Sequence, residues 1–282
     1  MPWLLKFVGS ILLLLLLLKL AGGASDRMVV VTTDEQNIVS IGRYINDQAP
    51  SVVLVGSSLS FRLSERYFSS LKVDNLAITG GSTVTGLQII AEGATNPQLV
   101  IIETNILVRP IDKDILHTYR SRRVIGQPIR MVAHAYEEWR HPPRSRDQIN
   151  QEVDAIISST PSGTGSQHQM ARAVADSYPD YPRAAIEANI GQMKRLIAKL
   201  NMRGIKTVLV EIPQPRELDP VSTVAMSRHL VREAFPDNDE WLTLDIIPSE
   251  LRWSDGTHLD KRSAAIVARA IEVSARRLLT RN

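Results

Sequence analysis

Short, wholly apolar runs alternate along this chain with longer stretches in which apolar residues recur every three or four positions. A short apolar run bounded by glycine, proline or polar residues predicts a strand that is buried on both faces. The longer amphipathic stretches predict helices that cover such strands. We expect five strands, at residues 52–55, 73–78, 97–105, 205–213 and 241–247.

Helices are expected between and after these strands. They are predicted at residues 59–70, 85–92, 184–201 and 264–279, with a further short helix inside residues 28–48. Strands this short and apolar, separated by helices, indicate a parallel sheet covered on both faces. The predicted fold is therefore a three-layer α/β/α domain with a central parallel sheet of about five strands.

The alternation of strands and helices stops between residues 107 and 182. This stretch is polar and rich in arginine, and it contains a Ser/Gly/Thr-rich segment at residues 158–169. It is too long for a simple connection inside a compact domain. We interpret it as a partly helical insertion, and insertions at the carboxyl ends of parallel strands commonly shape a functional site.

The first 25 residues form a separate hydrophobic segment. Twelve uncharged residues, 7–18, lie between Lys6 and Lys19 and include seven consecutive leucines. Twelve residues suit the core of a signal peptide, and the small residues at 21–24 offer a cleavage site. The eighteen residues 7–24 are also just long enough to span a bilayer if Lys19 reaches the outer interface. Both alternatives predict export, and an uncleaved anchor is the preferred one.

These observations predict three parts and a location in the cell envelope. Residues 1–25 are a signal anchor or signal peptide, 26–48 a linker with a short helix, and 49–282 a domain that carries the insertion at about 107–182. With an uncleaved anchor, the domain lies on the periplasmic side of the inner membrane. With a cleaved leader, it is periplasmic or secreted.

Composition narrows the chemistry. The formal net charge is only +3, which gives no argument for a nucleic-acid partner. The absence of cysteine excludes disulfides, thiolate catalysis and cysteine-ligated metal. No histidine outside the C-terminal turn has ligand spacing, and no glycine-rich segment is followed by Gly-Lys-Ser/Thr. We therefore expect neither a metal nor a cofactor.

Polar residues gather where the predicted strands end. The first strand runs into Gly56-Ser57-Ser58-Leu59-Ser60, the second into Gly80-Gly81-Ser82, and the third ends in Glu103-Thr104-Asn105. The fifth is followed by "WSDGTHLD", with Asp255 and His258. Ligands of open parallel sheets bind beyond these strand ends. A hydroxyl, a base, a carboxylate, a side-chain amide and glycine N–H groups are what acyl transfer through a serine ester requires.

Each cluster alone has a simpler interpretation. A serine after a strand is more often a helix cap than a nucleophile, and a glycine pair is usually a turn. A second Asp-x-x-His pair, Asp114 and His117, opens the insertion with the same spacing. Position favours Asp255 and His258, which follow the last strand and precede the final helix. The arginines 262, 269 and 276 recur every seven residues, as on a solvated helix face or one that meets anionic groups.

Taken together, the clusters resemble the four sequence blocks of the SGNH (GDSL-type) hydrolases, a superfamily of serine esterases and O-acyltransferases with a flavodoxin-like fold. "VLVGSSLS", "NLAITGGST", "IIETN" and "DGTHL" follow in the family's order. The resemblance implies that Ser58 is the nucleophile, with His258 as base and Asp255 as the acid that orients it. It implies an oxyanion hole made by the N–H groups of Ser58 and Gly80 and by the Asn105 side chain.

Two positions depart from the family pattern. The usual Gly-Asp-Ser is Gly56-Ser57-Ser58, and the usual Gly-x-Asn-Asp is Glu103-Thr104-Asn105-Ile106. A carboxylate at Glu103 could narrow the pocket, bind a substrate hydroxyl or alter the chemistry. We therefore place Ser57, Glu103 and Trp253, which adjoins the presumed catalytic turn, as candidates for the substrate pocket.

The expected function is hydrolysis or transfer of acyl groups, acetyl in the preferred case, on an envelope glycan. The expected partners are an acylated glycan or other ester substrate, the membrane through the N-terminal segment, and a membrane-bound acyltransferase. The alternative is a catalytically inactive, SGNH-like binding or assembly subunit of a polysaccharide-modification complex, which the changes at Ser57 and Glu103 favour. An intracellular lipase or thioesterase is a weaker alternative because of the leader.

Overall fold

The computed structural model describes residues 33–46, 51–125 and 145–280, together with a few positions among the first thirteen. The chain divides into two compact units, Met1–Gln36 and Asn37–Asn282, and the architecture below is that of the second. The predicted leader at residues 1–25 lies largely outside the described residues. Among the residues that are described, no helix is both long and apolar enough to cross a bilayer.

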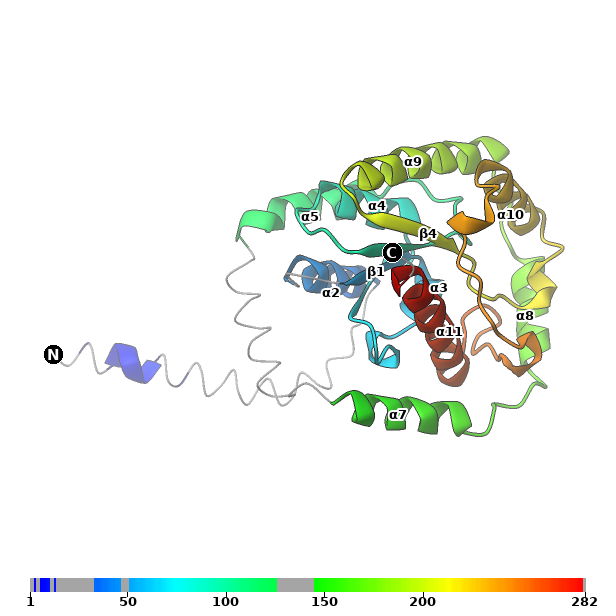
Figure 1. Cartoon of the computed structure of the whole chain (residues 1–282), viewed down its shortest axis with the longest axis horizontal. Helices are drawn as coiled ribbons and strands as arrows, with labels where there is room; N and C mark the ends of the chain where they lie inside the picture. Colours follow the sequence, from blue (N-terminus) through cyan, green and yellow to red (C-terminus); the bar gives the residue numbers. More distant parts are fainter. Residues whose placement is uncertain are drawn as a thin grey trace. The chain divides into compact units, whose positions relative to one another are not determined.

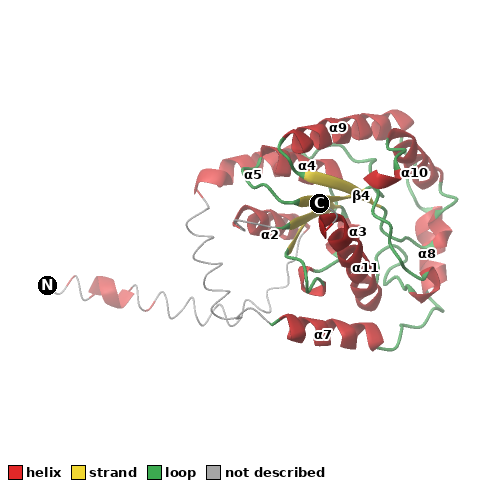
Figure 2. Ribbon diagram, in the orientation of Figure 1, coloured by secondary structure: helices red, strands yellow, loops and turns green. Residues whose placement is uncertain are grey.

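Four parallel strands form the centre of the larger unit (Figures 1 and 2). Their spatial order is β2-β1-β3-β4, so the chain passes from the edge strand β2 over β1 to β3 on its other side, and β4 forms the second edge. The two central strands, β1 and β3, are buried along their whole length, whereas the edge strands β2 and β4 contain partly exposed polar residues. The strands are β1 (Val52–Gly56), β2 (Val73–Ala77), β3 (Leu99–Glu103) and β4 (Lys206–Val210).

Successive side chains of a strand point to opposite faces, and both faces of this sheet are covered by helices. Val53 and Val55 of β1 pack into one apolar core, whereas Val52 and Leu54 pack into the other. Full burial of each such side chain is worth about 1.5–3 kcal/mol. The first core is completed by α2 (Thr33–Asn46), α4 (Thr83–Glu92), α5 (Lys113–Ile125), α9 (Arg183–Met202) and α10 (Ser222–Ala234).

The second core lies on the opposite face of the sheet, and Figure 1 shows α9 and α11 on different sides of the strands. The helical elements that contribute to it are α3 (Ser58–Phe61), the 3₁₀ turn η1 (Glu65–Tyr67), α7 (Arg146–Ser158) and α11 (Lys261–Thr280). The remaining short elements are α8 (Gln167–Asp176) and the 3₁₀ turns η2 (Arg216–Leu218), η3 (Asn238–Glu240) and η4 (Pro248–Glu250). This mixed α/β fold with a parallel sheet agrees with the predicted class.

The predicted fifth strand at residues 241–247 is wrong as a strand, because it makes only one isolated parallel bridge. Trp241 is bridged to Leu209, and the Leu242 N–H donates to the Leu209 carbonyl at 2.7 Å. Beyond that point the Thr243 carbonyl accepts from the Ser274 hydroxyl of α11 at 2.6 Å. A side chain of α11 thus takes a carbonyl that a continuing ladder would use, and the sheet has four strands rather than about five.

Two other expectations change. The helix predicted at residues 59–70 is a single turn, α3, followed by the separate turn η1. Within the predicted insertion, α5, α7 and α8 are helical, while residues 126–144 lie outside the described residues. Arg262 and Arg269 do not form a solvated face: they donate to the Ile157 carbonyl and to the Asn150 side chain of α7. They therefore tie the insertion to α11.

Candidate active site

The turn after β1 holds Ser58 at the surface while it buries its neighbours. Gly56, Ser57, Leu59 and Ser60 are buried, and only Ser58 of these five residues is partly exposed. The Ser57 hydroxyl accepts from the Leu59 N–H at 3.2 Å and so caps α3. The helix cap is thus Ser57, and its neighbour Ser58, the predicted nucleophile, takes no part in the cap.

Ser58, His258 and Asp255 form a continuous chain of hydrogen-bonding groups. The Ser58 hydroxyl oxygen lies 2.9 Å from His258 Nε2, although the two residues are 200 positions apart in sequence. On the other side of the imidazole, His258 Nδ1 lies 2.8 Å from Asp255 Oδ2. A base within reach of a hydroxyl, itself oriented by a carboxylate, is the arrangement that activates a serine.

The turn that carries His258 is held by its own backbone. Asp255 Oδ1 accepts from the His258 N–H at 2.8 Å and from the Thr257 N–H at 3.1 Å. The Ser254 N–H donates to the His258 carbonyl at 2.8 Å. Gly256 has φ of +81°, a conformation that residues with a side chain rarely adopt. The spacing Asp-Gly-Thr-His is therefore required by the turn as well as by the chemistry.

Asp255 is favoured in its ionised form. Partial burial by itself raises its pKa, but the hydrogen bonds from the His258 backbone and ring and from Thr257 outweigh it and hold the pKa below the ordinary value. Arg62, at the end of α3, lies 3.5 Å from the second carboxylate oxygen. A carboxylate kept ionised can fix the imidazole tautomer and stabilise its cation. Arg62 was not expected from the sequence, where it follows α3 with no recognisable motif.

Gly80 lies in the turn after β2 and presents backbone to solvent. It has φ of +71° and is exposed. The preceding residue, Thr79, is held by a side chain of α2: Asn37 Oδ1 accepts from the Thr79 N–H at 2.7 Å, and Asn37 Nδ2 donates to the Thr79 carbonyl at 2.9 Å. Within the described residues, neither the Gly80 nor the Ser58 N–H is used in a backbone hydrogen bond. In the described part of the chain both N–H groups thus lack a backbone acceptor, as donors to an oxyanion would.

Asn105 is the one predicted oxyanion donor that the structure engages elsewhere. Its Nδ2 donates to the Ile212 carbonyl at 2.8 Å and to Gln214 Oε1 at 3.1 Å, and its Oδ1 accepts from the Ile212 N–H at 2.8 Å. The side chain thus extends the pairing of β3 with β4 by one step. Both amide hydrogens have partners, so Asn105 would have to exchange one of them to serve an oxyanion.

Ser57 and Glu103, which we expected near a substrate pocket, lie together beneath the nucleophile turn. Both are fully buried, so neither lines an open pocket. Glu103 Oε1 accepts from the Ser57 hydroxyl at 2.6 Å. Glu103 Oε2 accepts from the Ser57 N–H at 2.8 Å, and from the Ser60 hydroxyl at 2.6 Å and N–H at 3.1 Å. The carboxylate is therefore fully engaged by the turn that holds Ser58.

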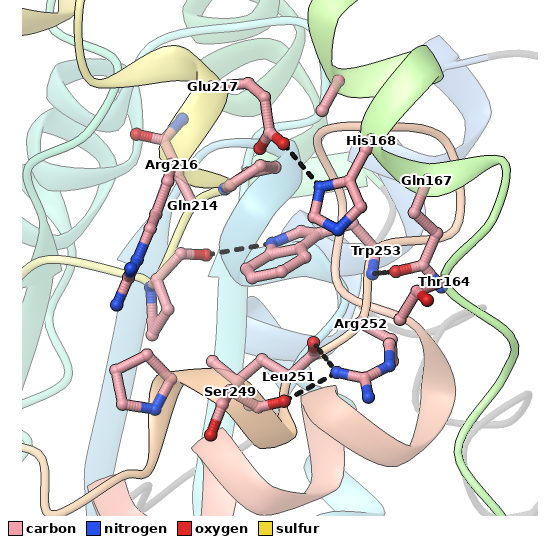
Figure 3. Close-up of a pocket in the computed structure, with 14 residues that line it drawn as sticks. Thr164, Gln167, His168, Gln214, Arg216, Glu217, Ser249, Leu251, Arg252 and Trp253 are labelled. Carbon is pink, nitrogen blue, oxygen red and sulfur yellow. Dashed lines mark hydrogen bonds and ion pairs between the residues drawn. The ribbon is translucent and has the colours of Figure 1, made fainter.

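Trp253 does line a cavity, of about 380 Å³, beside the catalytic turn (Figure 3). Its indole N–H points to the Pro213 carbonyl at 3.4 Å. Gln214, on the cavity wall, is the same residue that accepts from Asn105. The opposite wall comes from α8, where His168 lies 2.5 Å from Glu217. Through Trp253 the cavity adjoins the His258 turn, and through Gln214 it adjoins Asn105.

Helix α8 of the insertion also packs against the turn that carries His258, residues 254–258. A Cβ atom added to Gly256 would lie 2.6–2.8 Å from the backbone of Met170 and Ala171. Only a glycine allows this approach. No local sequence pattern indicates this contact, because the two segments are more than 80 residues apart.

The competing pair is elsewhere. Asp114 and His117 are both exposed on α5, on the core opposite to the one that α3 and α11 complete. Among the described residues, no three histidine or acidic side chains gather as metal ligands would. No family model matches this sequence, and no curated protein matches it. The function is therefore argued from the site.

Proposed function

We propose that this protein is an SGNH-type serine esterase or O-acyltransferase. The observation that carries the proposal is the chain of contacts from Ser58 through His258 to Asp255, with 2.9 and 2.8 Å between the paired atoms. The three side chains come from opposite ends of the domain's sequence and lie at hydrogen-bond distance in the order that acyl transfer needs. The parallel sheet and the four-block order of the sequence support the same family, with the five-stranded form of the fold reduced to four strands.

The first half-reaction forms an acyl-enzyme. Ser58 Oγ attacks the ester carbonyl carbon while its proton moves to His258 Nε2, and Asp255 stabilises the resulting imidazolium. The negative charge that develops on the carbonyl oxygen is met by the N–H groups of Ser58 and Gly80. Such donors are each worth about 3–4 kcal/mol in the transition state. The carbon–oxygen bond to the leaving alcohol then breaks, and His258 gives its proton to that alcohol.

The second half-reaction releases the acyl group. Water, or a hydroxyl of an acceptor, attacks the Ser58 ester and passes its proton to His258. Collapse of the second tetrahedral intermediate returns the proton to Ser58 Oγ. Water as the nucleophile gives hydrolysis, and a sugar hydroxyl gives O-acyl transfer.

We assign the substrate to the class of O-acylated glycans. The cavity beside the His258 turn combines an indole side chain, two glutamines and a His–Glu pair, which suits a hydroxylated ring next to the ester. The hydrophobic leader of the sequence supports an exported protein that meets an envelope polysaccharide, with a membrane-bound acyltransferase as the partner that supplies acyl groups.

A second candidate is an SGNH-like subunit that binds the glycan without turnover. The engagement of both Asn105 amide hydrogens favours it, because that side chain is then not free to stabilise an oxyanion. In this case the cavity would retain its ligand and the Ser58–His258 contact would have no reaction to serve.

Acetate release separates the two candidates. The full chain in detergent is incubated with p-nitrophenyl acetate and with acetylated xylan, and acetate is quantified. We expect release from both by the wild type, and a loss of 10³-fold or more in Ser58→Ala and in His258→Ala. His117→Ala, which removes the competing histidine, is the matched control and retains the wild-type rate. Binding of xylan with no release from either ester would favour the subunit.

A further inference from the structure

The two departures from the family pattern, at residues 57 and 103, occupy one site. β1 and β3 are neighbours in parallel register, with Val55 opposite Ile102. The next positions on the two strands are Gly56 and Glu103, and a Cβ atom at Gly56 would overlap the Glu103 carboxylate. The glycine at the end of β1 therefore leaves the space that the carboxylate of β3 fills.

The carboxylate holds the turn on both sides of Ser58. Its contacts are to the residue before the nucleophile, Ser57, and to the residue two positions after it, Ser60. Two of the four donors are backbone N–H groups and two are hydroxyls, and all are buried. A carboxylate is an acceptor only, so it matches four donors without competition. The backbone that sets the direction of Ser58 is thus fixed to β3.

We infer that Glu103 is a positioning residue for Ser58, and that its carboxylate replaces the one that the family pattern carries at position 57. The kinetic part of its test rests on the proposed function, because it needs esterase activity. An aspartate at position 57 would place its carboxylate in the same turn. The Ser57 side-chain oxygen at that position already caps α3 by accepting from the Leu59 N–H. Compared with the family pattern, the carboxyl group lies on the neighbouring strand instead of in the turn, and Ser57 donates to it.

We expect a carboxylate at position 57 to support the turn only when the carboxylate at position 103 is removed. Ser57→Asp alone brings a second carboxylate to a position where the hydroxyl now lies 2.6 Å from Glu103 Oε1, which is unfavourable for two like charges. Glu103→Gly alone leaves four buried donors without their acceptor. The double variant Ser57→Asp/Glu103→Gly has one carboxylate again. Misplacement of a nucleophile by about 1 Å costs on the order of 100-fold in rate.

The experiment measures kcat and KM for p-nitrophenyl acetate and the melting temperature of the wild type, both single variants and the double variant. We expect kcat to fall about 100-fold in each single variant at a temperature where it is folded, with KM little changed. In the double variant we expect kcat to recover at least 10-fold over both. Full kcat in folded Glu103→Gly, or a double variant slower than both singles, would overturn the inference.

Two controls make the result specific. Glu272 is also a buried glutamate, and it accepts from the Ser70 and Leu71 N–H groups at 2.6 and 3.0 Å, away from the nucleophile turn. Glu272→Gln is expected to lower the melting temperature and leave kcat unchanged. If Glu103→Gly does not fold, Glu103→Gln takes its place, with the same expected fall in kcat.

The melting temperatures also separate this inference from the proposed function. If the wild type releases no acetate, the proposed function fails, but the double variant must still melt above both single variants. If acetate is released and the double variant melts below both, the positioning role is wrong while the esterase remains.

Discussion

Among the single residues of the site, Asp255 matters because its carboxyl group is kept ionised. Its carboxylate accepts from two backbone N–H groups and contacts the His258 ring, and these contacts keep its pKa low despite partial burial. A depressed carboxyl pKa stabilises the folded state above the unfolded pKa of about 3.9, and this contribution is lost as the pH falls through the lower folded pKa.

We therefore expect the wild type and the Asp255→Asn variant to differ in stability by an amount that depends on pH. The wild type should exceed the variant in free energy of unfolding by a constant amount at neutral pH, and the difference should narrow below about pH 4 as the carboxylate is protonated. Urea unfolding of both proteins between pH 3 and pH 7 measures it. A difference that grows as the pH falls below about 4, where the carboxylate is protonated, would contradict the assigned contacts.

Several of these residues were predictable from the sequence and others were not. Ser58, Gly80 and the Asp255–His258 pair were singled out because they follow apolar runs or lie in a short turn, and the structure brings Ser58, His258 and Asp255 together. The role of Glu103 was not, since a carboxylate at a strand end gives no indication of whether it faces a pocket or the neighbouring strand. The partners of Asn105 depend on where the chain passes after β4, which a local pattern does not contain.

At the scale of elements, helix α8 and the catalytic turn are packed without space between them. Gly256 combines a positive φ with packing so close that an added Cβ atom would lie 2.6 Å from the Met170 backbone. An alanine there would force α8 and the turn apart. The insertion is therefore part of the support of the site and not only an appendage beside it.

Gly256→Ala should reduce both stability and activity. We expect a loss of about 2–4 kcal/mol in unfolding free energy, from backbone strain and from the clash with α8. Acetate release should fall with it, because His258 lies two residues away. The matched control is Gly204→Ala: Gly204 has φ of +73° but no heavy atom within 4 Å of an added Cβ. Equal losses in the two variants would show that the contact with α8 contributes nothing.

Elements were predicted best where one pattern decides them. The four strands and helices α4, α9 and α11 lie close to the expected positions because their apolar periodicity is strong. The segment at 241–247 has the alternating pattern of a strand, yet it makes only one bridge. Beyond that bridge the Thr243 carbonyl accepts from the Ser274 side chain instead of from a neighbouring strand. Helix α10 was missed, although its apolar residues follow a helical period.

At the scale of the whole molecule, the sheet brings distant segments to one edge. The Ser58 turn, the Gly80 turn and Asn105 follow β1, β2 and β3, which are parallel, so their carboxyl ends meet on the same side. Helix α11 then packs on the face that also holds α3, and this places the turn before it against Ser58. The long-range contact is thus a consequence of sheet topology.

The proposed mechanism requires that His258 activates Ser58 in the intact chain. The most direct test is reaction of the full-length protein with a fluorophosphonate, followed by mass spectrometry of its peptides. We predict one adduct, on Ser58, which is lost in Ser58→Ala and His258→Ala and retained in His117→Ala. A folded wild type that forms no adduct, or an adduct on another serine that persists in Ser58→Ala, would contradict this mechanism.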